Sequence, residues 1–258
     1  MGVLNVTPDS FSDGGLFLDL EAAVAHAVAM IDEGADVIDV GGASTRPGAA
    51  LPSEDEELAR VVPVVERLAA LGRARVSVDT MTPAVARAAV EAGATLLNDV
   101  SASLWPVARD TGAGWAAMHM QGTPATMQAD PNYDDVVGEV LALLLERADA
   151  AAAAGVGEVW IDPGFGFGKS VAHNLELLAR LDEFCATPYP VLVGLSRKST
   201  LGLLTLNPDG SVPAADDRLE ASIAGVVLAA TKGVGMVRVH DVAATVAAVR
   251  IVCDEVVV

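Results

Sequence analysis

The sequence predicts an α/β fold in which eight parallel strands alternate with helices and close into a single (β/α)8 barrel, the TIM-barrel architecture. Three observations support this prediction. Eight short apolar runs alternate with alanine-rich helical stretches along the 258 residues. The runs are continuously apolar, as in parallel strands covered on both faces. The length is close to the roughly 250 residues typical of one such barrel, so we expect one domain over residues 1–258.

Each predicted strand is a short run rich in valine, isoleucine and leucine. In chain order the runs are GVLNV (2–6), DVIDVGG (36–42), RVSVD (75–79), TLLND (95–99), GWAAMH (114–119), EVWID (158–162), PVLVGLS (190–196) and MVRVH (236–240). Eight repeats within the length of one domain favour a closed barrel over an open sheet.

Helical patterns fill the segments between these strands. The clearest are LEAAVAHAVAMIDEG (20–34), SEDEELARVVPVVERLAALG (53–72) and TPAVARAAVEAG (82–93). In the third, Thr82 is expected as the N-cap, Pro83 at the first helical position and Gly93 as the stop signal. The polar segment TLNPDGSVPAADD (205–217) is expected to be a surface loop rather than a linker between domains.

The charge balance and the cysteines exclude several classes of partner. The formal net charge is −19, whereas nonspecific binding to nucleic acid or to an anionic membrane depends on positive charge. No signal peptide precedes the first strand, and no apolar run approaches the roughly 18 residues that span a bilayer. Cys185 and Cys253 form no disulfide framework or zinc spacing, and both are expected to be buried. A cytoplasmic protein without nucleic-acid or membrane partners is therefore expected.

The segment DPGFGFGKS (162–170) raises the question of a phosphate-binding loop. In the P-loop pattern G-x-x-x-x-G-K-[ST], aligning the second glycine with Gly168 places Pro163 at the first, and proline has no N–H to donate. The three glycines are spaced G-x-G-x-G, which differs from the dinucleotide fingerprint G-x-G-x-x-G. What remains is a flexible loop that leaves a strand ending in Asp162.

Polar residues gather at the carboxyl ends of the predicted strands, where barrels of this kind carry their catalytic groups. They are Asn5, Ser44, Thr45, Arg46, Asp79, Asn98, Asp162, Ser196, Arg197, Lys198, Arg238 and His240. Each alone has a structural explanation. Asn98 or Asp99 could close a turn, Asp79 could cap the next helix, and His240 could be a hydrogen-bonded core histidine. Their joint placement predicts a functional site at this mouth of the barrel.

The residue types at the mouth indicate an anionic ligand and a flat heterocycle. The cationic groups suit a phosphate or pyrophosphate; they are Arg46, Arg197, Lys198, Arg238 and His240. Asn5, followed by Asp9 and Asp13, offers hard oxygen ligands to a Mg²⁺ ion carried in with the phosphates. The acceptors and donors that a nitrogen heterocycle needs are present in Asp79, Asn98 and Asp162. No Ser/His/Asp or Cys/His nucleophile arrangement stands out.

Taken together, these motifs closely resemble the dihydropteroate synthase family of the folate pathway. The matching blocks, in family order, are GVLNVTPDSFSDGG (2–15), DVIDVGGASTRPGA (36–49), VSVDT (76–80), LLNDVS (96–101), MHMQGTPATMQ (118–128), IDPGFGFGK (161–169), VLVGLSRKS (191–199) and VRVHDV (237–242). The resemblance implies a (β/α)8 barrel that condenses 6-hydroxymethyl-7,8-dihydropterin pyrophosphate with p-aminobenzoate and releases pyrophosphate in the presence of Mg²⁺. It also implies a homodimer formed through the outer helices.

The resemblance assigns site residues by motif position. The pterin would contact Asp79, Asn98, Met118, Asp162, Gly194 and Lys198. The pyrophosphate would contact Asn5, Thr45, Arg46, Arg238 and His240, with magnesium at Asn5 and Asp13. The p-aminobenzoate would lie among Thr45, Arg46, Pro47, Phe167, Lys198 and Ser199. The groups implied to act in catalysis are Arg46, Asp79, Lys198, Arg238 and His240.

Two other functions remain open at the level of sequence. A pterin-binding methyltransferase of the related barrel type would lack the STRPG and SRKS loops, and both are present here. A non-catalytic pterin binder similar to dihydropteroate synthase would be expected to have lost Asn5, Arg46 or Lys198, and all three are intact. The chain departs from the family at Ala43, where glutamate is common. It also departs at SASLWP (101–106), where a glycine-rich continuation is often found.

Overall fold

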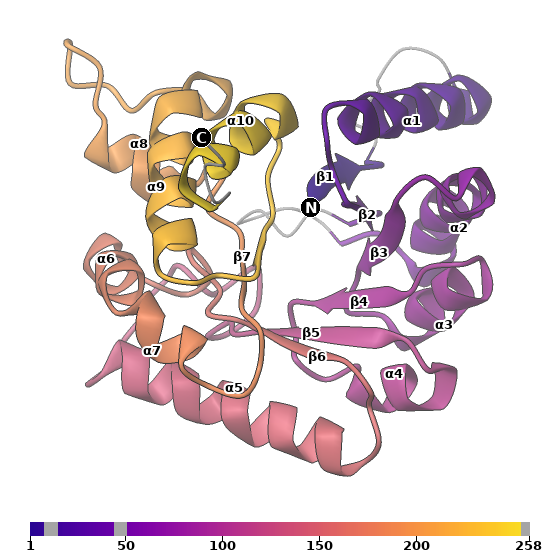
Figure 1. Cartoon of the computed structure of the whole chain (residues 1–258), viewed down its shortest axis with the longest axis horizontal. Helices are drawn as coiled ribbons and strands as arrows, with labels where there is room; N and C mark the ends of the chain where they lie inside the picture. Colours follow the sequence, from indigo (N-terminus) through magenta and orange to yellow (C-terminus); the bar gives the residue numbers. More distant parts are fainter. Residues whose placement is uncertain (8–14, 44–50, 254–258) are drawn as a thin grey trace, which may run out of the picture.

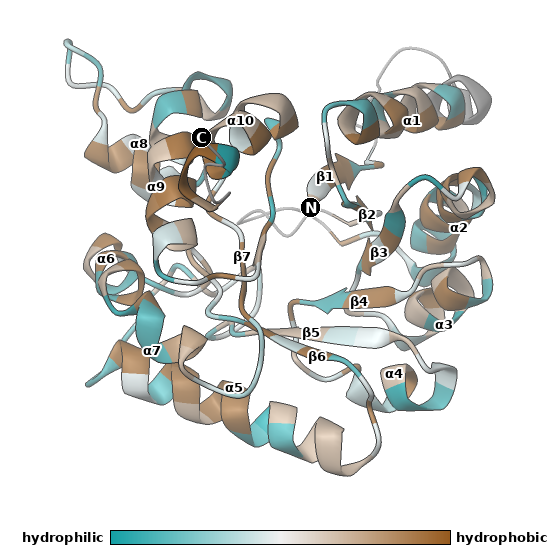
Figure 2. Ribbon diagram, viewed as in Figure 1, coloured by the Kyte–Doolittle hydropathy of each residue, from teal (hydrophilic) through white to brown (hydrophobic). Residues whose placement is uncertain are grey.

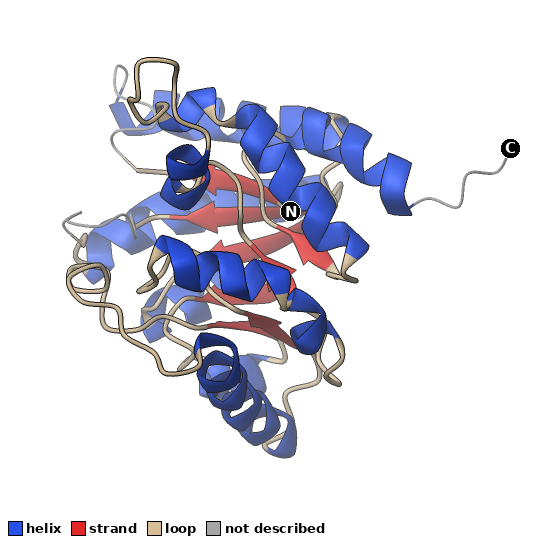
Figure 3. Ribbon diagram, turned by 90° about the vertical axis from the view of Figure 1, so that its left-hand side faces the viewer, coloured by secondary structure: helices blue, strands red, loops and turns tan. Residues whose placement is uncertain are grey.

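The structure is a computed structural model that describes residues 1–7, 15–43 and 51–253, without the side chains of residues 15–19. Parallel strands lie in the interior and helices surround them (Figure 1, Figure 3). The strands are β1 Gly2–Asn5, β2 Val37–Gly41, β3 Arg75–Asp79, β4 Leu96–Asp99, β5 Gly114–Met118, β6 Val159–Asp162, β7 Leu192–Val193 and β8 Met236–Val237. Each lies within or beside its predicted run.

The eight strands close into a barrel, which confirms the predicted fold class. Strands β1 to β6 form one parallel sheet in chain order, and β7 pairs with β8. Two isolated parallel bridges join these sheets, one between Gly2 and Val239 and one between Ile161 and Val191. The backbone N–H of Val3 donates to the carbonyl of Val239 at 2.9 Å, so the first strand meets the last.

The last two strands are shorter than predicted. The predicted runs were 190–196 and 236–240, but regular pairing ends at Val193 and Val237. One further ladder bond joins the N–H of Arg238 to the carbonyl of Val193, at 2.9 Å. Beyond it, the N–H of His240 donates to the hydroxyl of Ser196 at 3.2 Å. A side chain therefore replaces the backbone carbonyl as acceptor, and the ladder stops.

The helices cover the outside of the barrel. They are α1 Gly15–Asp32, α2 Glu54–Leu71, α3 Pro83–Glu91, α4 Trp105–Thr111, α5 Val136–Ala153, α6 Val171–Ala179, α7 Leu181–Cys185, α8 Ser199–Leu204, α9 Leu219–Thr231 and α10 Val242–Cys253, with a 3-10 turn at Ala215–Asp217. The polar segment 205–217 is exposed over most of its length, as expected of a surface loop. None of the helices in the described part of the chain is both long and apolar enough to cross a bilayer.

Local sequence signals fix the helix ends, with one correction. Ser53 and Glu56 form a capping box at the start of α2, each accepting a backbone N–H from the other. Thr82 occupies the N-cap position of α3, but its side chain makes no capping hydrogen bond. Its hydroxyl donates to Glu57 instead, at 3.0 Å. Helix α3 ends at Glu91, and Gly93 follows with a positive φ of 115°, as the stop signal predicts.

Two apolar layers support the barrel. The larger one packs helices against strands, and Figure 2 shows hydrophobic segments along these helices. The smaller one comprises Met1, Val37, Leu96, Ala116 and Leu192, with Trp160 and Met236 packed against it. Several of its members precede mouth residues by two positions, as Leu96 precedes Asn98, so they share the inward face and form a floor. Polar groups above this floor are thereby shielded from water on one side.

The cysteines differ from expectation. Cys185 is half-buried, but Cys253 is exposed. Cys253 ends α10 at the surface, and an apolar composition alone does not place a residue inside.

Candidate active site

A layer of paired residues forms the wall of the barrel mouth. The strand register aligns Asn5 with Gly41, Gly41 with Asp79, and Asp79 with Asn98. A Cβ atom on Gly41 would lie 3.6 Å from the Asn5 amide oxygen and 3.7 Å from a carboxylate oxygen of Asp79. Asn5 and Asp79 therefore flank Gly41 at van der Waals distance, from the two neighbouring strands. Two predicted pterin residues, Met118 and Asp162, are likewise paired, on β5 and β6.

Arg238 connects this layer to a carboxylate below it. Its Nε donates to Asp39 at 2.6 Å and its Nη2 donates to Asp79 at 2.8 Å. Asp39 is fully buried, so the guanidinium balances two carboxylates inside the barrel. Arg238 was expected to contact pyrophosphate; here its side chain lies inside the barrel, against the residues expected to hold the pterin.

Asp39 was not among the site residues predicted from the sequence. Its Oδ2 accepts from Arg238 and also from the amide of Asn98, at 2.9 Å, so it holds two mouth residues at once. The signal was present, because a carboxylate interrupts the apolar run VIDVG two positions before Gly41 and so faces the same way. Within the described residues, the other oxygen of Asp39 and the hydroxyl of its register partner Ser77 have no hydrogen-bond partner.

The contact with Asp39 fixes the orientation of the Asn98 amide. The NH2 group of Asn98 uses one of its two N–H donors on Asp39, so its second N–H and its amide oxygen remain to meet a ligand. Asn98 thus offers both a donor and an acceptor toward the mouth.

Burial changes the charge states of the two predicted pterin carboxylates. It raises the pKa of Asp79 to about 7, against the opposing influence of Arg238. It also raises the pKa of Asp162 to about 6, although the N–H of Gly164 donates to its Oδ1 at 2.7 Å. Asp39 shares the guanidinium of Arg238 with Asp79, and its negative charge raises the pKa of Asp79 further. Asp79 and Asp162 therefore both titrate near neutral pH.

Lys198 lies between these carboxylates and the glycine-rich loop. Its ammonium lies 3.9 Å from the centre of the Phe167 ring, a cation–π contact. Burial lowers the pKa of Lys198 to about 8, and nearby Arg238 adds to the effect. Ser199, also predicted for the arylamine, is exposed at the start of α8. Gly194 follows β7 and lies next to Arg238. A Cβ atom placed on the glycine would be 3.9 Å from the Cβ of Arg238.

Two predicted cations of the mouth need correction. The Nδ1 of His240 is 3.1 Å from the hydroxyl of Ser196, and burial together with Arg238 lowers the pKa of His240 to about 4. The imidazole is therefore neutral at pH 7 without a ligand. The guanidinium of Arg197 is paired with Asp241 at 2.7 Å and also contacts Asp216, so its charge is neutralised away from the mouth.

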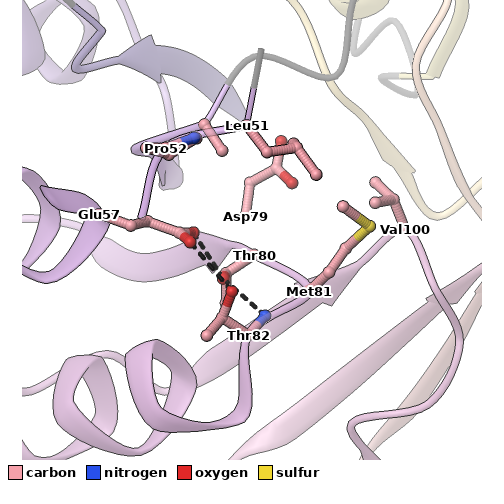
Figure 4. Close-up of a pocket in the computed structure, with 9 residues that line it drawn as sticks. Leu51, Pro52, Glu57, Asp79, Thr80, Met81, Thr82 and Val100 are labelled. Carbon is pink, nitrogen blue, oxygen red and sulfur yellow. Dashed lines mark hydrogen bonds between the residues drawn. The ribbon is translucent and has the colours of Figure 1, made fainter. Parts of the chain in front are cut away.

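A buried carboxylate on α2 also borders the mouth. Glu57 accepts from the hydroxyl of Thr80 at 2.6 Å and from that of Thr82 at 3.0 Å. Figure 4 shows these contacts and Asp79 beside the same pocket. Ala43 is part of the pocket lining, so the position at which the family commonly has glutamate adjoins the carboxylate of Glu57. A second carboxylate there would be close to Glu57.

The departure at SASLWP has a structural explanation. Asp99 accepts from the N–H groups of Ser103 and Leu104 and from the indole of Trp115, at 2.6 to 3.0 Å. Ala102 adopts a positive φ of 50° inside this turn, a conformation that glycine adopts more easily. The carboxylate of Asp99 thus organises the turn that a glycine-rich segment would otherwise form, and this is the turn-closing role considered for it.

Six candidate residues lie outside the described residues: Asp9, Asp13, Ser44, Thr45, Arg46 and Pro47. The donor set that is described suits a Mg²⁺ ion only in part. Asn5 supplies one hard oxygen, and the described residues contain no group of three or more His, Cys, Asp or Glu side chains able to hold a metal.

Comparison with known proteins defines first a class and then a family. The model of the pterin binding enzymes matches residues 1–240, so the chain is a pterin-binding barrel protein. It is 49% identical to the dihydropteroate synthase of Escherichia coli K12, over 98% of this chain and 89% of that protein. It is 48% identical to that of Mycobacterium leprae, over 98% and 91%. The chain belongs to the dihydropteroate synthase family.

Solved structures agree with this assignment. A dihydropteroate synthase of Xanthomonas albilineans with 4-aminobenzoic acid has a TM-score of 0.89 and 49% identity, over 97% of this chain and 90% of that one. The same enzyme in complex with 7,8-dihydropteroate has a TM-score of 0.85 and 47% identity, with the same coverage. These relatives favour the synthase over the methyltransferase alternative.

Proposed function

We propose that this protein is a dihydropteroate synthase of folate biosynthesis. It transfers the pterin-methyl group of 6-hydroxymethyl-7,8-dihydropterin pyrophosphate to p-aminobenzoate, and it releases pyrophosphate. The observation that carries the proposal is the arrangement of Asp79, Asn98 and Asp162 near Lys198 and Arg238 above an apolar floor. Acceptors lie beside cations there, which suits a pterin that carries a pyrophosphate.

The pterin is bound by the inner layer. Asp79 and Asp162 accept from its N–H groups, and the Asn98 carbonyl is an acceptor beside them, while Met118 and Gly194 line the walls. The ionised carboxylates also favour the positive charge that spreads from the CH2 group into the ring as the leaving group departs. The pterin therefore enters first and lies deepest.

The pyrophosphate lies toward the outer edge of the mouth. Asn5, Arg238 and His240 are its described partners, and Thr45 and Arg46 join them from the loop after β2. An anion close to His240 raises the pKa of this residue, so the neutral imidazole gains a proton as the ligand binds. When bound, Mg²⁺ at Asn5 and Asp13 supplies charge neutralisation to the leaving pyrophosphate.

The arylamine binds beside the pterin. Phe167, Lys198 and Ser199 form its described pocket, and Thr45, Arg46 and Pro47 complete it. An arylamine is neutral and nucleophilic at pH 7, so no general base is required, and its proton leaves to water. The C–O bond to pyrophosphate breaks and a C–N bond forms. We infer a dissociative order, which predicts slow pyrophosphate loss without arylamine and a rate that depends weakly on arylamine nucleophilicity.

The test is turnover by the purified protein. The full chain is mixed with the pterin pyrophosphate, p-aminobenzoate and Mg²⁺, and both products are followed. Lys198→Ala should lower kcat/KM by about a hundredfold or more, because a half-buried cation at the reacting centre is lost. Lys232→Ala, which removes surface contacts with Asp182 and the carbonyl of Ala179, should not change it. Absence of turnover with measurable pterin binding would instead support the non-catalytic binder.

We further propose that the enzyme is a cytoplasmic homodimer. Apolar side chains are exposed on the C-terminal third of the described chain: Leu203, Leu204, Leu206, Leu219, Leu228, Ile251 and Val252. Most of them lie on or next to α8, α9 and α10. Such a concentration supports an interface formed by outer helices.

A further inference from the structure

The ammonium of Lys169 lies inside the glycine-rich loop, although the proposed chemistry gives it no role. The side chain is 3% exposed. Its Nζ is 3.0 Å from the carbonyl oxygens of Gly164 and Phe167 and 3.0 Å from Nδ1 of His119. The carbonyl of His119 lies at 3.4 Å. The loop 162–170 thus closes around a buried amino group, and burial lowers the pKa of Lys169 to about 7.

The partners of Lys169 match its donors. Burial, with the charge of Lys169 itself, lowers the pKa of His119 to about 3, so the imidazole is neutral. Its Nδ1 can then accept a hydrogen bond, with the ring proton assigned to Nε2. Three acceptors face the three N–H bonds of the ammonium. A buried charge is tolerated under these conditions because its hydrogen bonds replace those to water.

These contacts determine the shape of the turn that presents Phe167. The turn begins at Gly164, and the N–H of Phe167 donates to the carbonyl of Gly164 at 3.0 Å. Lys169 binds the carbonyls at both ends of this turn. The ring of Phe167 covers the ammonium of Lys198 at 3.9 Å, so its placement decides the shape of the pocket between them.

We propose that Lys169 is a positioning residue that holds Phe167 over Lys198 and thereby sets the affinity for the arylamine substrate. This inference rests on the proposed function, because Phe167 and Lys198 are its arylamine residues. Two other loop carbonyls are held separately, that of Gly166 by Gln128 and that of Gly168 by Tyr133, both at 2.8 Å. Lys169 therefore acts on the Phe167 turn in particular.

The pterin residues are linked to Lys169 less directly, since Lys169 acts on Asp162 only through its charge, which lowers the pKa of that carboxyl. Asp162 belongs to β6, its carbonyl accepts from the N–H of His119 at 3.0 Å, and it pairs with Met118 in the sheet. Asp79 and Asn98 lie on other strands. Loss of the ammonium should therefore affect arylamine binding more than pterin binding.

Lys169→Met tests the inference, because it keeps the length of the side chain and removes every donor. The KM for p-aminobenzoate should rise by at least about tenfold, whereas the KM for the pterin pyrophosphate should change by less than about threefold. Lys232→Met is the matched control and should leave both values unchanged. A KM for p-aminobenzoate within twofold of wild type, or equal rises in both KM values, would overturn the proposal. Lack of wild-type turnover would refute the proposed function instead.

A double-mutant cycle with Phe167→Leu separates positioning from a general structural effect. If Lys169 acts through Phe167, the rise in arylamine KM caused by Lys169→Met should largely disappear in the Phe167→Leu background. If the fold changes in arylamine KM of the two single variants simply multiply in the double variant, the mechanism is contradicted. Should Lys169→Met fail to fold, as judged by circular dichroism, His119→Leu removes one acceptor and should give the same split between the two KM values. Unchanged KM values in folded His119→Leu would then count against the proposal.

Discussion

At the scale of single residues, buried hydrogen bonds to Asp39 determine what the mouth offers to a ligand. One oxygen of this carboxylate accepts from both Asn98 and Arg238. It thereby orients an amide and a guanidinium that the sequence placed correctly at the strand ends. The sequence did not reveal their connection, because the partner lies one layer deeper on β2, a strand that pairs with neither of theirs.

Substitution Asp39→Asn should disturb both residues. An amide in place of the carboxylate loses the charge that pairs with Arg238, and hydrogen bonds to charged groups contribute about 1.5–3 kcal/mol. We expect kcat/KM for the pterin substrate to fall by roughly 10- to 100-fold in a steady-state assay. Asp149→Asn, an exposed change that touches only Tyr189, is the control. Wild-type kinetics in Asp39→Asn would contradict this account of the site.

Titration of Asp79 and Asp162 should make pterin binding depend on pH. Burial raises the pKa of Asp79 to about 7 and that of Asp162 to about 6. Protonated carboxyls accept less well, so affinity for a pterin should weaken below pH 7, by about tenfold per unit, and more steeply below pH 6. Calorimetric titration from pH 5.5 to 8 measures this, with Asp79→Asn removing the first step. Affinity that stays constant over this range would be inconsistent with these raised pKa values.

The raised pKa values of Asp79 and Asp162 also determine how the free energy of unfolding changes with pH. Between the ordinary carboxyl pKa of about 4 and the raised values, the folded protein holds protons that the unfolded chain releases. These two groups therefore make the free energy of unfolding fall as pH rises through that window. Urea unfolding of wild type and Asp79→Asn at pH 5 and pH 8 tests the direction.

At the scale of elements, the glycine-rich loop shows why its sequence resembles a phosphate-binding motif without being one. Most of its carbonyls and several of its N–H groups already have partners within the protein. Close packing, rather than ligand approach, explains the glycines. A Cβ on Gly164 would lie 1.8 Å from the carbonyl oxygen of His119, and φ there is +67°. The spacing of the glycines excluded the nucleotide-binding motifs. It could not show that the chain after β5 packs so closely against this loop that glycine is required.

Gly164→Ala should therefore be strongly destabilising. The methyl group collides with a backbone oxygen that cannot move without distorting β5, so we expect a loss of more than about 3 kcal/mol in urea unfolding. Gly157→Ala, where a Cβ meets nothing within 4 Å, should change stability by less than about 0.5 kcal/mol. Equal stabilities for the two variants would show that the loops are not packed as described.

For the other elements, predictions succeeded where the local sequence determines the structure. They failed where a side chain from elsewhere in the fold determines it. The Gly93 stop signal depends on neighbours in sequence, and Gly93 has the expected positive φ. Thr82 occupies the expected cap position, but Glu57 from another helix takes its hydroxyl. Arg197 lies in the predicted mouth loop, but with a positive φ of 61° it is turned toward Asp241.

At the scale of the whole molecule, barrel closure brings Arg238 on the last strand against Asp39 and Asp79 on the second and third. The eight-run pattern and chain length predicted this fold, because strand count and alternation are properties of the sequence. The charge of His240 could not be predicted in the same way. Its neutral state follows from burial beside Arg238, which only closure of the barrel produces.

The homodimer proposal belongs to this scale. Sedimentation velocity should give about twice the chain mass of 26.3 kDa, and Leu228→Glu on α9 should yield monomers if these helices form the interface. Replacement of an exposed residue away from them, Leu143→Glu on α5, is the control. A wild-type chain that sediments as a monomer at micromolar concentration would refute the dimer.

The central claim is that this barrel holds a pterin on Asp79, Asn98 and Asp162 with the arylamine beside Phe167 and Lys198. A crystal structure of the protein with 7,8-dihydropteroate tests it most directly. The account predicts hydrogen bonds of about 2.7–3.2 Å from the pterin ring to the first three residues, with the aminobenzoyl group against the last two. Product bound elsewhere, or a pterin that makes none of these three hydrogen bonds, would contradict it.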